Sequence, residues 1–169
     1  LTQFEVPGLP ELTCSEVFSF AFATPDGERH VRGIADLNAD WAFQPDTVAA
    51  VEAAAHRAVD GLADLGTYRV SNVTILLLAD QFRPLGEPLP EATPDDPTPT
   101  RPRELLAQAW DPTSGAPLGD CRMTLFLWGA GGVTADFPTT MAHELFHCVQ
   151  YATLSPEQMQ TFGSRGDWW

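Results

Sequence analysis

Residues 143–147 read His-Glu-Leu-Phe-His, and the types and spacing of these side chains could bind a metal ion. On a helix, residues four apart project from one face, so the imidazoles of His143 and His147 could both bind one Zn²⁺. Glu144 lies one step round such a helix, beside the metal, where it could take a proton from a zinc-bound water. The first candidates for chemistry are therefore two metal ligands, His143 and His147, and one general base, Glu144.

The surrounding sequence predicts a helix that would position this motif. Pro138 followed by Thr139 or Thr140 is a helix start signal. Two roles stay open for Gln150, which lies three residues after His147: it lines the site, or it hydrogen-bonds nearby. The alternative for the whole stretch is an ordinary core helix that binds no metal. Helical periodicity around the motif is carried by Met141, Leu145, Phe146, Val149 and Ala152.

Two elements are predicted near the start of the chain. The sequence Thr24-Pro25-Asp26-Gly27 is a turn signal between the strand-like runs 17–22 and 29–37, and it predicts a β-hairpin. Apolar residues then recur at three- and four-residue spacing, which predicts an amphipathic helix over 46–65. His56 falls on the polar face of that helix and is predicted to be a solvated side chain.

The middle of the chain is predicted to alternate strands with a long loop. Buried strands are predicted over 73–79 and 123–128, where short apolar runs occur. Seven prolines between 84 and 102 exclude a helix or a central strand and predict a surface loop. A short helix is predicted over 103–110.

At the motif, the sequence resembles the zincin metallopeptidases. The metzincin branch carries a glycine three residues and a histidine six residues after the second histidine, where this chain has Gln150 and Thr153. The resemblance is instead to gluzincin-type secreted bacterial metalloproteases. It implies an α+β fold, with a zincin-like mixed sheet, the helix 46–65 behind the site and an HExxH active-site helix. It also implies a single catalytic domain over 1–169, interrupted by the proline-rich loop 84–102.

The resemblance further implies a third zinc ligand, for which two candidates stay open. Asp167 lies 20 residues after His147, a spacing that suits a gluzincin ligand. In several gluzincin groups, however, the ligand is a glutamate that follows a tryptophan-rich segment, which favours a ligand beyond Trp169. On that hypothesis, 1–169 is the amino-terminal portion of a larger domain and holds zinc weakly through two histidines.

We therefore expect a zinc-dependent endopeptidase that cleaves a peptide or protein substrate through a zinc-activated water, with Glu144 as the general base. The segment Met123 to Trp128 is expected to be the exposed strand edge that holds the substrate extended. The alternative function is a degenerate or incomplete zincin domain that acts as a zinc-binding or regulatory module. A metal-free structural domain is the third hypothesis.

Composition excludes some classes of partner. The 169 residues include nine arginines, no lysine and 23 acidic residues, for a net charge of −14. Nucleic acids and anionic membranes both require a cationic patch, so we expect neither as a partner.

The cysteines leave two states open. Cys14, Cys121 and Cys148 have no CxxC spacing, which argues against a cysteine zinc site. One disulfide with one buried thiol would suit a secreted protein, and three reduced cysteines would suit a cytoplasmic one. Secretion is the state that the resemblance implies. Cys148 would point about 100° away from His147 on a helix, so it is expected to be a core thiol or half of a disulfide.

Overall fold

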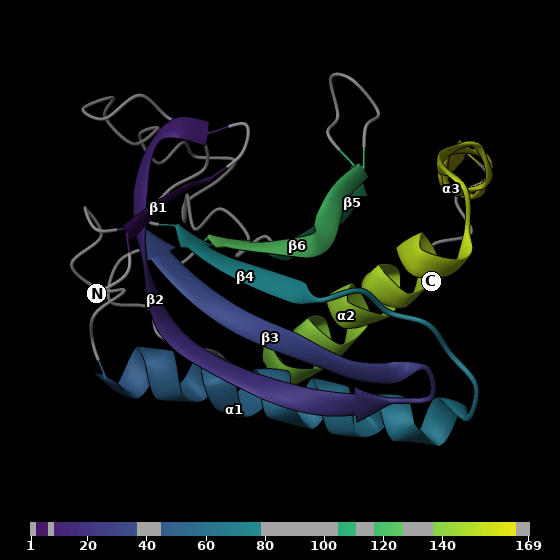
Figure 1. The fold of residues 1–169 in the computed structure, drawn as a ribbon, viewed down its shortest axis with the longest axis horizontal. Helices are drawn as coiled ribbons and strands as arrows, with labels where there is room; N and C mark the ends of the chain where they lie inside the picture. Colours follow the sequence, from purple (N-terminus) through teal and green to yellow (C-terminus); the bar gives the residue numbers. More distant parts are fainter. Residues whose placement is uncertain are drawn as a thin grey trace, which may run out of the picture.

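The computed structural model describes residues 3–6, 9–36, 45–78, 105–110, 117–126 and 137–164. In these ranges a six-stranded mixed sheet is covered on one face by the helices α1 and α2 (Figure 1). The strands, in spatial order, are β1 (Gln3–Val6), β2 (Leu9–Thr24), β3 (Gly27–Asp36), β4 (Val73–Leu78), β6 (Pro117–Phe126) and β5 (Leu105–Trp110). The helices are α1 (Pro45–Leu62), the 3-10 helix η2 (Ala63–Leu65), α2 (Phe137–Thr153) and α3 (Pro156–Ser164). The prediction of an α+β fold is confirmed at this level.

The strands β2 and β3 form the predicted hairpin. Its turn ends at Gly27, whose φ of 127° is one that residues with a side chain rarely adopt. Further along the hairpin, Phe18 lies opposite Gly33 in the register. A Cβ atom at Gly33 would lie 2.2 Å from the ring of Phe18, so the ring occupies the space that the glycine leaves open.

The helix predicted over 46–65 is confirmed as α1 followed by η2. Gly66, with φ 72°, follows the last turn. One face of α1 is buried against the sheet, as the apolar spacing predicted. That buried face consists of Val51, Ala54, Ala55, Ala58, Val59 and Leu62.

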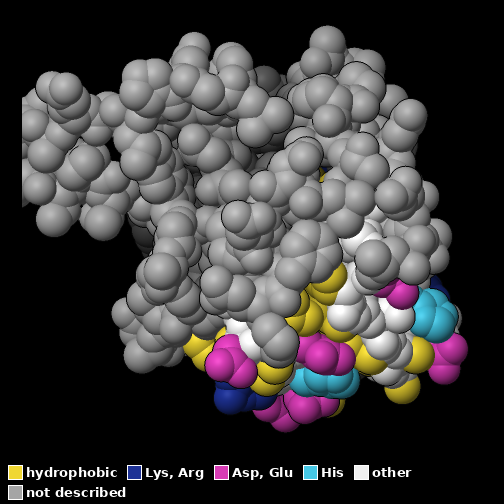
Figure 2. Space-filling view, turned by 90° about the vertical axis from the view of Figure 1, so that its left-hand side faces the viewer, with side chains coloured by type: hydrophobic (Ala, Val, Ile, Leu, Met, Phe, Trp, Pro, Cys, Tyr) yellow, Lys and Arg dark blue, Asp and Glu magenta, His cyan; other side chains and the backbone are white. Residues whose placement is uncertain are grey.

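The opposite face of α1 is polar and acidic. Asp46 and Asp60 are exposed there, and Figure 2 shows acidic and histidine side chains gathered at the lower end of the molecule, where α1 lies in Figure 1. His56 is exposed, as predicted. Its ring also stacks on Phe20 of β2, with 3.6 Å between the ring centroids and 17° between the planes. The exposed histidine therefore covers part of the ring of Phe20, which is half-buried.

Three parallel strands form the centre of the sheet. In the register, β4 lies between β3 and β6, so that Val31, Val73 and Cys121 are aligned across the three strands. The strand predicted over 73–79 is confirmed through Leu78. The strand predicted over 123–128 begins earlier, at Pro117. Core side chains from these strands pack under the helices, among them Val31, Val73, Ile75, Met123 and Leu125.

The helix predicted over 103–110 is wrong, because Leu105–Trp110 is the strand β5. β5 pairs antiparallel with β6, and Leu106 lies opposite Thr124. The sequence of this segment carries no strong helix cap, and pairing with β6 satisfies its backbone hydrogen-bonding groups better than one isolated turn of helix could.

The expectation that the segment Met123 to Trp128 is an exposed strand edge is also wrong. Its described part belongs to β6, which lies between β4 and β5 and is hydrogen-bonded on both sides. β5 is instead the last strand in the order, and within the described ranges it has a neighbour on one side only.

Two predicted features lie outside the described residues: the proline-rich loop 84–102 and the segment 166–169 with Asp167. Among the residues that the structure describes, no helix is long and apolar enough to cross a membrane.

Candidate metal centre

The helix α2 carries the His-Glu-Leu-Phe-His motif and is anchored by its apolar face. It begins at Phe137, next to the predicted start signal at Pro138. Met141 and Leu145 are buried in the core shared with α1 and the sheet, and α2 also contacts β5 and β6. Burial of these residues fixes the rotation of the helix about its axis and therefore sets the direction in which the motif residues point.

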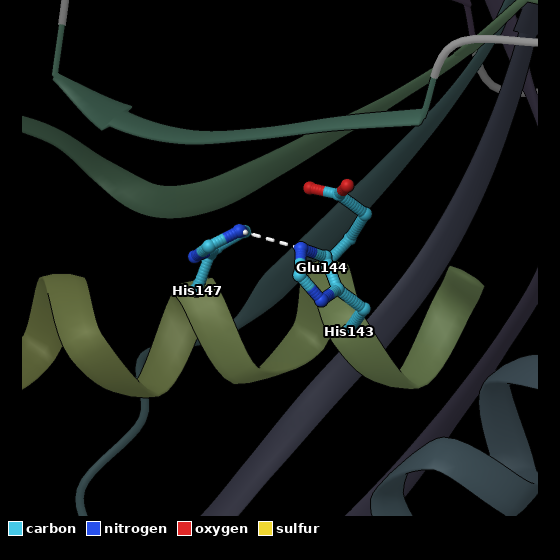
Figure 3. A group of neighbouring side chains, drawn as sticks. All are labelled: His143, Glu144 and His147. Carbon is cyan, nitrogen blue, oxygen red and sulfur yellow. Dashed lines mark hydrogen bonds between the residues drawn. The ribbon is translucent and has the colours of Figure 1, made fainter. Parts of the chain in front are cut away.

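The two histidines converge at their Nε2 atoms. His143 Nε2 and His147 Nε2 are 3.1 Å apart, and the planes of the two rings lie at 88° to each other. Glu144 projects beside them from the same helix (Figure 3). One potential ligand atom from each of the three residues lies within 4.8 Å of the others. His143 is exposed, whereas Glu144 and His147 are half-buried.

The spacing of the two Nε2 atoms fits a divalent metal ion. Two nitrogen ligands at 2.0–2.1 Å from a tetrahedral zinc ion are about 3.3 Å apart. The observed separation of 3.1 Å is close to that value, and both donor atoms belong to imidazoles, which zinc binds readily. The predicted pair of ligands therefore has the right chemistry and nearly the right separation without any rearrangement of α2.

Gln150 hydrogen-bonds to one of the histidines, which answers the question that the sequence left open. The Nδ1 atom of His147 lies 2.6 Å from Oε1 of Gln150. An amide oxygen can only accept, so Nδ1 of His147 must carry the hydrogen and donate it. In a neutral imidazole this leaves the lone pair on Nε2, the atom that faces His143.

Tyr151 is a neighbour of the site that the sequence analysis did not single out. Its pKa is raised above 10.0, first by burial and second by the negative charge of Glu144. The two residues are seven positions apart, or about two turns of helix, so they lie on the same face of α2. This spacing could have identified Tyr151 from the sequence. The tyrosine therefore senses the charge of the proposed general base.

A disulfide fixes α2 to the sheet directly after His147. Cys148 is bonded to Cys121 of β6, with 5.6 Å between their Cα atoms, and both residues are fully buried. The expectation that Cys148 points into the core is confirmed, and of the two redox states left open the structure contains the disulfide. Cys14 is a buried thiol.

The structure thus brings together His143, Glu144, His147 and Gln150, all on α2. Within the described ranges, the group that could hold a metal ion consists of the first three of these side chains. Asp167, the candidate third ligand, lies outside those ranges. Comparisons with protein-family models, with curated proteins and with solved structures found no match.

Proposed function

We propose that this chain is a zincin-like, zinc-dependent endopeptidase of the gluzincin type, and that it acts on peptide or protein substrates. The observation that carries the proposal is the convergence of His143 Nε2 and His147 Nε2 to 3.1 Å, with the carboxylate of Glu144 beside them. The mixed sheet with α1 and α2 on one face is compatible with a zincin-like fold. His143 and His147 would hold the ion, which when bound polarises a carbonyl and makes water more acidic.

Glu144 is proposed as the general base. Its carboxylate is half-buried and lies within 4.8 Å of both imidazoles, so it can reach a water molecule that sits between it and the two Nε2 atoms. It would accept a proton from that water as the water attacks the scissile carbonyl, and then pass the proton to the leaving amine.

The strand β5 is proposed as the edge that holds the substrate. It contacts α2, and in the described part of the chain it pairs with β6 on one side only. An extended peptide could therefore add to the other side of β5 through main-chain hydrogen bonds. Under this proposal β5 takes the role that the sequence assigned to β6.

The disulfide supports a proposed location outside the cytoplasm. Bonds such as that between Cys121 and Cys148 form and persist mainly in oxidising compartments, which include the extracellular space. A secreted protein is therefore proposed, in agreement with the gluzincin resemblance.

The substitution Glu144→Gln tests the proposed peptidase activity, and His147→Ala is the comparison variant. Glu144→Gln should lower the rate of cleavage of a quenched-fluorescence peptide at least 100-fold and leave zinc affinity nearly unchanged, because only the base is removed. His147→Ala should abolish both cleavage and tight zinc binding. Peptide cleavage that persists in Glu144→Gln would refute the proposed role of Glu144.

A zinc-binding or regulatory module is the second candidate, and one observation favours it. In the described ranges only two imidazoles and Glu144 meet, whereas a catalytic zinc needs three protein ligands and an open position. Zinc titration of the variant Asp167→Asn tests whether Asp167 is the third ligand that a catalytic site needs. A drop in zinc affinity would identify Asp167 as the third ligand. Zinc binding without cleavage of any tested peptide would favour the module.

A further inference from the structure

The hydrogen bond between His147 and Gln150 lies where it can fix the ring of a proposed metal ligand. It joins Nδ1 of His147 to Oε1 of Gln150 at 2.6 Å, while Nε2 of the same ring lies 3.1 Å from Nε2 of His143. The imidazole of His147 is therefore held at both of its nitrogen atoms. Both partners lie on α2, and its buried face fixes their positions.

We propose that Gln150 is a positioning residue that selects the tautomer of His147 and orients its ring for metal binding. This inference rests on the metal site proposed above. The amide oxygen accepts the hydrogen from Nδ1, which leaves the lone pair on Nε2, the atom that lies 3.1 Å from Nε2 of His143. A hydrogen-bond acceptor of this kind behind a ligating histidine also raises the basicity of the ligand.

The geometry distinguishes this role from two simpler ones. Gln150 is half-buried and lies three residues after His147, so its side chain reaches the back of the ring and not the side that faces His143. A residue that only stabilised the helix would not need an acceptor atom at this point. A residue that only contacted substrate would affect the binding of a peptide but not the affinity for zinc.

The test compares three substitutions by zinc titration of the whole chain against a competing chelator. Gln150→Leu keeps the size of the side chain but removes the acceptor, and should weaken zinc binding about 10- to 100-fold. Gln150→Glu keeps an acceptor oxygen and should bind zinc within about threefold of the unchanged chain, or more tightly. Gln160→Leu, at an exposed glutamine of α3, is the matched control and should have no effect.

A second measurement needs no metal. Nitrogen NMR of the zinc-free chain should show the hydrogen of neutral His147 on Nδ1, and should show a shift toward the Nε2–H form in Gln150→Leu but not in Gln150→Glu. Unchanged zinc affinity in Gln150→Leu, or an unchanged tautomer, overturns this inference and leaves the metal site standing. If neither the unsubstituted chain nor His147→Ala binds zinc in the titration, the proposed function and this inference are both overturned.

Discussion

Cys121 and Cys148 join the central sheet covalently to the helix turn that carries His147. Both cysteines are fully buried, so the bond lies inside the core and not on its surface. The bond holds α2 against β6 at one point, while the apolar contacts of Met141 and Leu145 hold it further toward the start of the helix. The candidate ligands lie between these two attachments.

Removal of this disulfide should lower the stability of the fold. Cross-linking residues separated by 27 positions is worth about 3–4 kcal/mol through the entropy of the unfolded chain. The double variant Cys121→Ala with Cys148→Ala should therefore unfold at a clearly lower urea concentration. Its midpoint should not change when a reducing agent is added, whereas the midpoint of the unsubstituted chain should fall. Equal midpoints for the two proteins under oxidising conditions would contradict the prediction.

Gly33 should tolerate no larger residue, because the ring of Phe18 fills its place. Gly33→Ala would put a Cβ 2.2 Å from that ring and force it to move, at a cost of about 1–3 kcal/mol in the free energy of unfolding. Gly61 in α1 is the matched control, since a Cβ there would meet nothing within 4 Å. Gly61→Ala should stabilise the helix by about 0.5–1 kcal/mol. If denaturant titrations gave changes in the free energy of unfolding of the same sign for both variants, the steric argument would be contradicted.

The open edge of β5 can be tested with proline at two successive residues. In an antiparallel pair, neighbouring residues direct their N–H groups to opposite edges of the strand. One of Leu106→Pro and Ala107→Pro should therefore remove a hydrogen bond to β6 and lower stability by about 1–3 kcal/mol. The other should fold normally and raise the KM for a peptide substrate about tenfold, because it removes a donor that the substrate would use. If the variant that folds normally keeps the original KM, substrate does not pair with β5.

The pKa of Tyr151 reports on the charge of Glu144. Burial is the larger cause of the raised pKa and Glu144 the smaller, so Glu144→Gln should bring the pKa part of the way back toward 10.0. Tyr68 is an internal control, because its pKa is raised by burial and by Asp26 instead. The chain has two tyrosines, so NMR of their Cζ atoms can follow each one separately. An equal shift of both would show a global change and not a local charge effect.

The raised pKa of Tyr151 also predicts how the free energy of unfolding changes at alkaline pH. A tyrosine whose pKa is higher in the folded chain than in the unfolded chain contributes its full stability below pH 10.0, and loses it as the pH rises through the folded value. Tyr151→Phe should therefore lose less stability than the unsubstituted chain above pH 10, as measured by denaturant titration. A steeper loss in the variant would reverse the sign of the expected linkage.

The parts of the fold that could be predicted from sequence are those that depend on local chemistry. The hairpin was marked by Pro25-Asp26-Gly27, α1 by its apolar spacing, and α2 by its start signal and periodicity. Residues 105–110 were assigned wrongly because six residues of mixed propensity become a strand only by pairing with another segment, here β6, whose start at Pro117 the sequence did not predict. The order of the strands is likewise a property of long-range pairing, so the sequence placed the open edge on the wrong strand.

In the site, spacing alone placed His143, Glu144 and His147 together. The hydrogen bond of Gln150 could not be predicted, because a residue at that position could equally have turned toward the site or toward solvent. The disulfide partner of Cys148 could not be predicted either. With three cysteines, the pairing depends on which strand lies next to the helix, and that strand is β6.

The direction of β5 sets the polarity of any chain bound at its edge. β5 runs opposite to β6, β4 and β3, which are parallel to one another. A peptide that adds to β5 in the antiparallel sense, the more stable kind of pairing, would run in the same direction as those central strands. Its amino-terminal half would then lie along the Trp110 end of β5 and its carboxyl-terminal half along the Leu105 end. The fold would thus fix which of the two product fragments leaves from each end of the strand.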